Sequence, residues 1–164
     1  MLMKKLFLSI LVICSLLGGN AYAEKINLVC QDREKKFLPY ILIFDMKKNN
    51  VQRCVTCDWE YFHKSERMIL WSSLGASKSQ NWRMVQLNDI NRVEGIYQRT
   101  RIYIDKKAYD RIGYLNNEII MDQSEDDSNK KMRKIFFMRA SEARVNKIKE
   151  EVDIFDCKRK EKVL

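Results

Sequence analysis

Hydrophobic and polar residues alternate with a period of two over most of the chain beyond residue 25. This spacing is typical of β-strands, in which successive side chains point to opposite faces of a sheet. Polar segments, such as residues 45–50 and 72–81, separate the alternating runs and predict turns or loops. Asn116 and Asn117 predict a two-residue hairpin turn, because asparagine tolerates a positive φ. The pattern as a whole predicts strands over residues 26–30, 37–44, 51–56, 59–63, 67–71, 82–87, 96–105, 108–115, 118–122 and 134–138.

The period changes near the C-terminus. Ser141 can cap a helix, and Val145, Ile148 and Val152 recur at helical spacing after it. We therefore expect one short C-terminal helix of about ten residues. The acidic segment 123–131 predicts a loop. The predicted fold is all-β, mainly an antiparallel meander that closes as a small barrel or folds as a sandwich.

Residues 1–23 have the three parts of a secretory signal peptide. Lys4 and Lys5 precede an uncharged apolar run from Leu6 to Leu17, and Ala21-Tyr22-Ala23 places small residues where a signal peptidase reads them. The run is shorter than the roughly 20 residues that span a membrane. We expect a mature single β-rich domain of residues 24–164, periplasmic or secreted, with no transmembrane segment.

The positive charge of the chain narrows the classes of partner. The sequence has 31 lysines and arginines against 22 acidic residues. Two of the basic residues lie in the signal peptide, which leaves 29 basic and 22 acidic residues and a net charge of +7. Outside the cytoplasm such a protein meets anionic lipids, cell-wall polymers and other proteins. We expect an anionic envelope component or a protein as partner and no nucleic acid; a charge that serves solubility alone is the alternative.

Four cysteines remain in the mature domain, and an even number in an oxidising compartment predicts two disulfides. Three pairings are possible. We favour Cys30 with Cys157 and Cys54 with Cys57. Cys30 follows the first apolar run of the domain and Cys157 follows the last, so their pairing would tie the two ends together.

Cys54 and Cys57 also have the spacing of a thiol–disulfide oxidoreductase. That chemistry needs the first cysteine at a helix N-terminus, whereas the flanking residues predict strand, so a structural disulfide is favoured. We expect no catalytic residue, no metal site and no cofactor. His63 is the only histidine, no serine lies in a nucleophile-elbow sequence, and residues 122–127 lack the ligand spacing of a calcium loop.

The strand predicted from Ile96 to Asp105 provides the candidate binding surface. Its alternation places Tyr97, Arg99, Arg101 and Tyr103 on one face. Two guanidinium groups framed by two phenol rings favour an anionic or sugar-bearing ligand, through bidentate hydrogen bonds and stacking. Ordinary cross-strand pairing on a solvent face is the alternative.

Four other aromatic residues alternate with polar neighbours. They either pack in the core or line a barrel pocket or a carbohydrate platform: Trp59, Tyr61, Trp71 and Trp82.

The segment Leu87-Asn88-Asp89-Ile90-Asn91-Arg92-Val93-Glu94-Gly95 resembles one found in small exported all-β proteins of proteobacteria that are themselves uncharacterised. In those proteins a cysteine lies early in the mature chain and an Arg-x-x-Gly element follows a central strand. Cys30, Arg92 and Gly95 match these features here. The resemblance implies an exported all-β domain and no particular activity.

These observations favour a non-catalytic, disulfide-stabilised envelope protein that binds an anionic or protein partner. Two alternatives stay open. One is a periplasmic thiol–disulfide oxidoreductase that uses Cys54 and Cys57. The other is a lipocalin-like carrier of a small apolar ligand, which requires an apolar cavity in a closed barrel.

Overall fold

The computed structural model describes residues 25–160 except residues 55, 78 and 79. The predicted signal peptide, residues 1–23, lies outside the described residues. Nine strands form one antiparallel sheet in the order β4-β3-β2-β1-β9-β8-β7-β6-β5, which confirms the all-β fold class. The strands are β1 (Lys25–Asp32), β2 (Tyr40–Asp45), β3 (Asn50–Gln52), β4 (Glu60–Tyr61), β5 (His63–Lys64), β6 (Met68–Ser77), β7 (Trp82–Asn91), β8 (Ile96–Ile104) and β9 (Lys147–Arg159).

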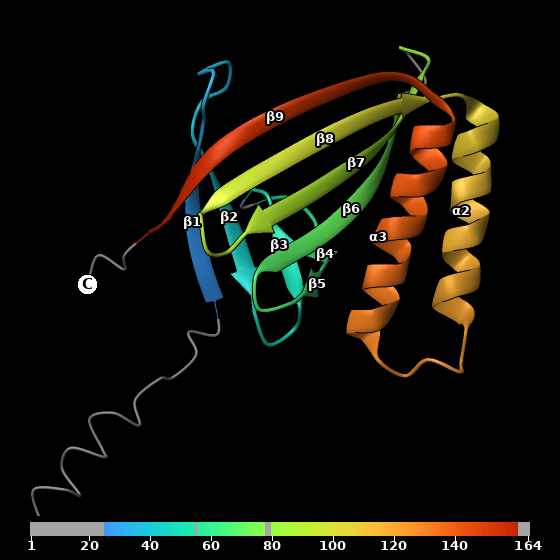
Figure 1. The fold of residues 1–164 in the computed structure, drawn as a ribbon, viewed down its shortest axis with the longest axis horizontal. Helices are drawn as coiled ribbons and strands as arrows, with labels where there is room; N and C mark the ends of the chain where they lie inside the picture. The colour runs from blue at the N-terminus through green and yellow to red at the C-terminus, as the bar shows by residue number, and fades with distance from the viewer. Residues whose placement is uncertain (1–24, 55, 78–79, 161–164) are drawn as a thin grey trace, which may run out of the picture.

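The sheet curls into a nearly closed barrel. Its two edge strands, β4 and β5, are separated in sequence by Phe62 alone, so the chain itself brings the edges together. Phe62 is fully buried, and its amide donates a hydrogen bond to the Asn49 carbonyl, 2.9 Å away. Opposite this seam, β9 runs from the helices across the molecule to β1 (Figure 1).

Two helices, α2 (Lys106–Met121) and α3 (Ser128–Val145), lie between β8 and β9 in the sequence. They form an antiparallel hairpin on one side of the sheet (Figure 1). Asp105 and Asp127 cap them, because each carboxylate accepts a backbone N–H of the first turn. No helix in the described part of the chain is long and apolar enough to cross a membrane.

The alternation of β7 and β8 divides the apolar residues between two cores. The barrel core contains Trp71, Tyr97 and Phe155, whose rings stack at centroid distances of 5.5 and 5.2 Å. The helix core lies between the outer face of the sheet and the helices, and includes Val85 from β7 and Ile102 from β8. Strands β7 and β8 are therefore buried on both faces.

The predicted strands 108–115, 118–122 and 134–138 are wrong, since these residues lie in α2 and α3. The hairpin turn predicted at Asn116 and Asn117 is wrong for the same reason. The residues that α2 buries, Ala108 and Ile112, are four apart, which is the spacing of a helix face. Short runs within this sequence also alternate with a period of two, which is typical of a strand. The local pattern alone therefore does not distinguish a helix from a strand here.

Several predicted boundaries are also wrong. The strand predicted over 37–44 begins only at Tyr40, the one over 51–56 ends at Gln52, and the one over 82–87 continues to Asn91. Helix α3 ends at Val145, whereas the predicted helix begins at Ser141 and continues over residues that form β9. Strand β6 continues to Ser77 through the start of the loop predicted at 72–81. Helix α3 begins at Ser128, within the loop predicted at 123–131.

Both predicted disulfides are confirmed. Cys30 and Cys157 lie directly opposite each other on β1 and β9 and are buried in the barrel core. Cys54 and Cys57 are bonded within the segment between β3 and β4, where the Cys57 amide also donates to the Cys54 carbonyl. The first bond joins residues 127 positions apart, and the second joins residues 3 apart.

We predict that replacing Cys30 and Cys157 together by alanine lowers the free energy of unfolding by about 5 kcal/mol, because the chain-entropy cost of closing a loop rises with loop length. The matched control replaces Cys54 and Cys57, and the same relation gives about 2 kcal/mol for so short a loop. Urea unfolding of the two double variants and the wild type measures both values. Equal losses would contradict the assignment of the β1–β9 bond as the main covalent constraint.

Candidate functional site

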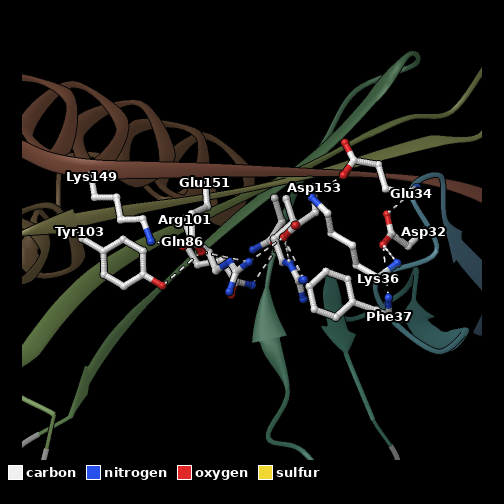
Figure 2. A network of polar contacts seen from close by, with 12 residues as sticks. Asp32, Glu34, Lys36, Phe37, Gln86, Arg101, Tyr103, Lys149, Glu151 and Asp153 are labelled. Carbon is white, nitrogen blue, oxygen red and sulfur yellow. Dashed lines mark hydrogen bonds and ion pairs between the residues drawn. The ribbon is translucent and has the colours of Figure 1, made fainter.

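The four residues of the predicted binding face lie on β8 and point into the curve of the sheet. Their register with β9 gives each one an opposite partner on the same face. We call these four residues and their partners on β9 the ladder. Figure 2 shows much of the ladder as a row of polar side chains along β8 and β9. The pairs are Tyr97 with Phe155, Arg99 with Asp153, Arg101 with Glu151, and Tyr103 with Lys149.

Arg99 is held on three sides. Its Nε donates to Asp153 Oδ2 at 3.0 Å, and its Nη2 lies 2.9 Å from the same oxygen. Its guanidinium lies 4.9 Å from the ring centre of Phe37 and 5.2 Å from that of Phe155, which are cation–π distances. The Asp153 side chain is only 7 % exposed, so this ion pair is shielded from solvent.

Arg101 shares the carboxylates of the neighbouring strand. Its Nη2 lies 3.1 Å from both Glu151 Oε2 and Asp153 Oδ2. Glu151 also accepts from Lys149 Nζ at 2.5 Å and from the Tyr103 hydroxyl at 3.3 Å. The hydrogen bond from Lys149, followed by the charge of Arg101, holds the pKa of the Glu151 carboxyl below its usual value. The ladder thus pairs its own charges.

Tyr97 is a core residue and not part of an open surface. Its side chain is fully buried, and its hydroxyl donates to Asn88 Oδ1 at 2.7 Å. The next residue of the face, Arg99, is covered by the loop after β1. Asp32 accepts from the backbone amides of Lys36 and Phe37, and so holds the Phe37 ring over Arg99 (Figure 2). An anion bound here would compete with two carboxylates, and ligand binding by these residues stays a prediction.

Sequence reasoning missed Asp153 and Glu151, the residues that neutralise the arginines. The helix predicted from Ser141 extends towards these residues, and a helix would not pair with β8. Only a strand in this position places Asp153 and Glu151 opposite the arginines. The signal that finds them is the alternation of charged and apolar residues over Glu151–Cys157, once this segment is taken as a strand.

The other residues considered for chemistry have structural partners. His63 Nδ1 lies 3.0 Å from the Asn129 carbonyl, and the Asn129 side chain bonds both backbone groups of Lys64, so this contact fixes the start of α3 on β5. Cys54 and Cys57 lie in a segment with no helix among its described residues. No group of metal-binding side chains occurs in residues 25–160 outside the three undescribed positions.

One end of the barrel has an apolar pocket of about 230 Å³, which we call the end pocket. Its walls come from β1, β2, β6, β7 and β9. Two arginines, Arg92 and Arg159, lie among the lining residues and are exposed. No carboxylate of the described residues lies within ion-pair distance of either arginine, although Arg92 Nη1 donates to the Ser65 carbonyl. The apolar lining is Ile26, Leu28, Phe44, Met46, Ile69 and Ile90.

The turn between β7 and β8 shapes one wall of this pocket. The Asn91 side chain accepts the amides of Val93 and Glu94, and Gly95 follows with a φ of +69°. A Cβ on Gly95 would lie 2.9 Å from the Cys157 carbonyl oxygen. Only glycine suits both the positive φ and this close approach to β9. The turn therefore lies directly against the strand that holds the disulfide.

Asp89 lies on the face of β7 that is turned towards the helix core. It lies on the same face as Val85 and Leu87 of the helix core, and no hydrogen bond or ion pair joins its carboxylate to a described residue. Partial burial raises the pKa of the Asp89 carboxyl from its ordinary value of 3.8 to about 6. The Asp89 carboxyl therefore stays protonated up to a higher pH in the folded protein than in the unfolded chain.

We predict that Asp153→Ala lowers the free energy of unfolding by about 3 kcal/mol, because it leaves Arg99 without its shielded partner. Asp156→Ala is the matched control on the same strand, since its partner Arg33 is exposed and such pairs contribute less than about 1 kcal/mol. Urea unfolding at neutral pH measures both. If the two variants lost the same stability, the ladder would not be the stabilising element described here.

We also predict that Asp89→Asn stabilises the protein relative to the wild type as the pH rises from 4 to 7. The folded carboxyl binds a proton more tightly than the unfolded one, so wild-type stability falls between the unfolded pKa near 3.8 and the folded pKa near 6. The variant lacks this titration. Urea unfolding of both proteins at pH 4 and pH 7 measures the difference, and a difference that does not change with pH would contradict the prediction.

The comparisons with known proteins add no relative. No protein-family model matches the chain, and no curated protein or solved structure is significantly similar to it. The resemblance of residues 87–95 to exported proteobacterial proteins therefore stays a prediction. The side chains of the ladder and of the pockets are what any assignment of function has to explain.

Proposed function

We propose that this protein is an exported, non-catalytic binding protein for a small anionic amphiphile, with the ligand's apolar part in the end pocket and its charged head on Arg92 and Arg159. Export is supported by the pattern of residues 1–23 and by two disulfides, which persist in oxidising compartments. This ligand belongs to the class of anionic envelope components expected from the charge of the chain.

The observation that carries the proposal is the combination of an apolar pocket with two arginines that have no carboxylate partner among the described residues. Burying an apolar chain there contributes about 0.8 kcal/mol per methylene group. A guanidinium at the mouth binds a carboxylate, sulfate or phosphate through paired hydrogen bonds. The arginines of the ladder differ in this respect, because Asp153 and Glu151 already neutralise them.

The packing of the barrel limits the size of the ligand. Large side chains, among them Trp71, Tyr97 and Phe155, fill the barrel core beyond the end pocket. The deep cavity that a lipocalin-like carrier requires is therefore not present among the described residues. The volume of about 230 Å³ suits a short acyl chain or one of comparable size and excludes a long lipid tail from full burial.

The test is calorimetric titration of the mature, oxidised protein with sodium octanoate below its micelle concentration. Octanol has the same tail without the charge, and butyrate has the same charge with a shorter tail. We predict that octanoate binds more tightly than either. The double substitution Arg92→Gln and Arg159→Gln is expected to reduce octanoate affinity about tenfold, which corresponds to about 1.4 kcal/mol, and to leave octanol binding unchanged.

Lys158→Gln is the matched control, because Lys158 is an exposed cation next to Arg159 whose side chain points to the opposite face of β9. It is expected to leave octanoate binding intact. Absence of octanoate binding would overturn the proposal. So would an affinity that survives the loss of both arginines, or one that Lys158→Gln reduces as strongly as the double substitution does.

A further inference from the structure

A second pocket lies at the seam of the barrel and shares no lining residue with the end pocket, although β6 contributes to both. Strand β5 pairs with β6 only at Ile69 and Leu70, so no described strand pairs with that edge of β6 beyond Leu70. The helix hairpin covers this stretch instead. The resulting cavity, here the seam pocket, has a volume of about 210 Å³ and is lined by residues of the β4 segment, β6, α2 and α3.

Arg139 of α3 takes the place of a strand partner at the seam. Its Nη1 donates to the Ser72 carbonyl at 2.7 Å and lies 3.2 Å from the Ser72 hydroxyl. Its Nη2 donates to Asn116 Oδ1 at 2.7 Å, which ties α3 to α2. Burial lowers the pKa of Arg139 to about 10, so the guanidinium is still charged at neutral pH. The pocket therefore has one fixed cation in its wall.

Three residues of the pocket wall each have a buried polar atom without a hydrogen-bond partner among the described residues: Trp71 Nε1, Glu60 Oε2 and Arg139 Nε. The Trp71 side chain is almost completely buried, at 1 % exposure. An unsatisfied buried group costs about 1–3 kcal/mol, and folded proteins have few of them. Of the six such atoms in the described residues, three belong to residues that line this one cavity, and a bound molecule with hydrogen-bonding groups would complete them.

The chemistry of the wall selects the kind of molecule. Two of the unpaired atoms are donors and one is an acceptor, and a hydroxyl group serves both. Glu60 bonds Arg53 through its other oxygen at 2.9 Å. One carboxylate and one guanidinium in the same wall favour neither an anion nor a cation. A neutral molecule with several hydroxyl groups fits this arrangement.

The mouth of the pocket is aromatic and its helical side is apolar. Trp59 and Tyr61 line it with side chains that are 39 % and 64 % exposed. Exposed aromatic rings beside a small cavity provide flat apolar faces, and α2 and α3 add Ile120, Met132 and Ile135. A sugar ring has C–H faces that suit these residues and hydroxyl edges that suit the polar wall.

We propose that the seam pocket binds one neutral sugar ring, with its hydroxyl groups on Glu60, Arg139 and Trp71 and its C–H face against Trp59, beside Tyr61. This site is separate from the end pocket and does not depend on the amphiphile proposed above. Of the four aromatic residues considered for a carbohydrate platform, Trp59, Tyr61 and Trp71 line this cavity and Trp82 does not. Trp82 instead packs on Tyr103, with ring centres 6.4 Å apart.

The test is calorimetric titration of the mature, oxidised protein with glucose, galactose, mannose and N-acetylglucosamine. At least one is expected to bind saturably with a dissociation constant in the millimolar range or below, and to change the tryptophan fluorescence. Glu60→Gln and Trp59→Ala are each expected to weaken that binding at least tenfold. Glu60→Gln keeps the shape of the side chain, and Trp59→Ala changes a partly exposed one, so neither should prevent folding.

Trp82→Phe is the matched control, because it removes a tryptophan outside the seam pocket and should leave sugar affinity unchanged. Failure of all four sugars to saturate the wild type overturns the proposal. Binding that both seam variants retain at wild-type strength also overturns it, since the sugar would then lie elsewhere. Urea unfolding of the same variants distinguishes a failed seam site from a misfolded protein without relying on ligand binding at the end pocket.

Discussion

Pairing of the first and last strands of the domain, β1 with β9, fixes the positions of most other features. The Cys30–Cys157 bond locks this pairing in one register. A shift by one residue would turn every inward side chain of β9 to the outer face. Phe155 would then leave the barrel core, and Asp153 would no longer face Arg99. The core, the charged ladder and the wall of the end pocket are therefore consequences of one cross-strand register.

The seam on the other side of the barrel has a different physical basis. Strands β4 and β5 have two residues each, too few to pair along the whole of β6. A helix hairpin covers the exposed edge, and Arg139 supplies hydrogen bonds that a strand would otherwise make. A side chain reaches only one carbonyl, whereas a strand satisfies a whole row of groups. The cavity between the β4 segment, β6 and the helices lies where this strand pairing is missing.

The sequence predicted those features that depend on local alternation or on a small number of possible pairings. The shared face of Tyr97, Arg99, Arg101 and Tyr103 follows from a period of two, and the disulfides follow from three possible pairings. The strands predicted over 108–115, 118–122 and 134–138 are wrong, because the short alternating runs there conceal the helix starts that the caps Asp105 and Asp127 mark. Asp153 was missed because β9 was taken in part for a helix. Each pocket joins four or more segments of the chain, so no single stretch of sequence contains it.

The ladder and the seam pocket contain the same types of side chain but differ in how completely they are satisfied. In the ladder, Asp153 and Glu151 pair with both arginines, Tyr103 and Lys149 donate to Glu151, and of its buried side-chain atoms only Arg101 Nε lacks a partner among the described residues. Such a network stabilises a fold and leaves little for a ligand to gain. In the seam pocket, Trp71 and Glu60 keep unused hydrogen-bonding capacity at a buried site. Hydrogen bonds from a ligand would offset the cost of these unsatisfied atoms. The seam pocket, which has more of them, is therefore the stronger candidate for binding.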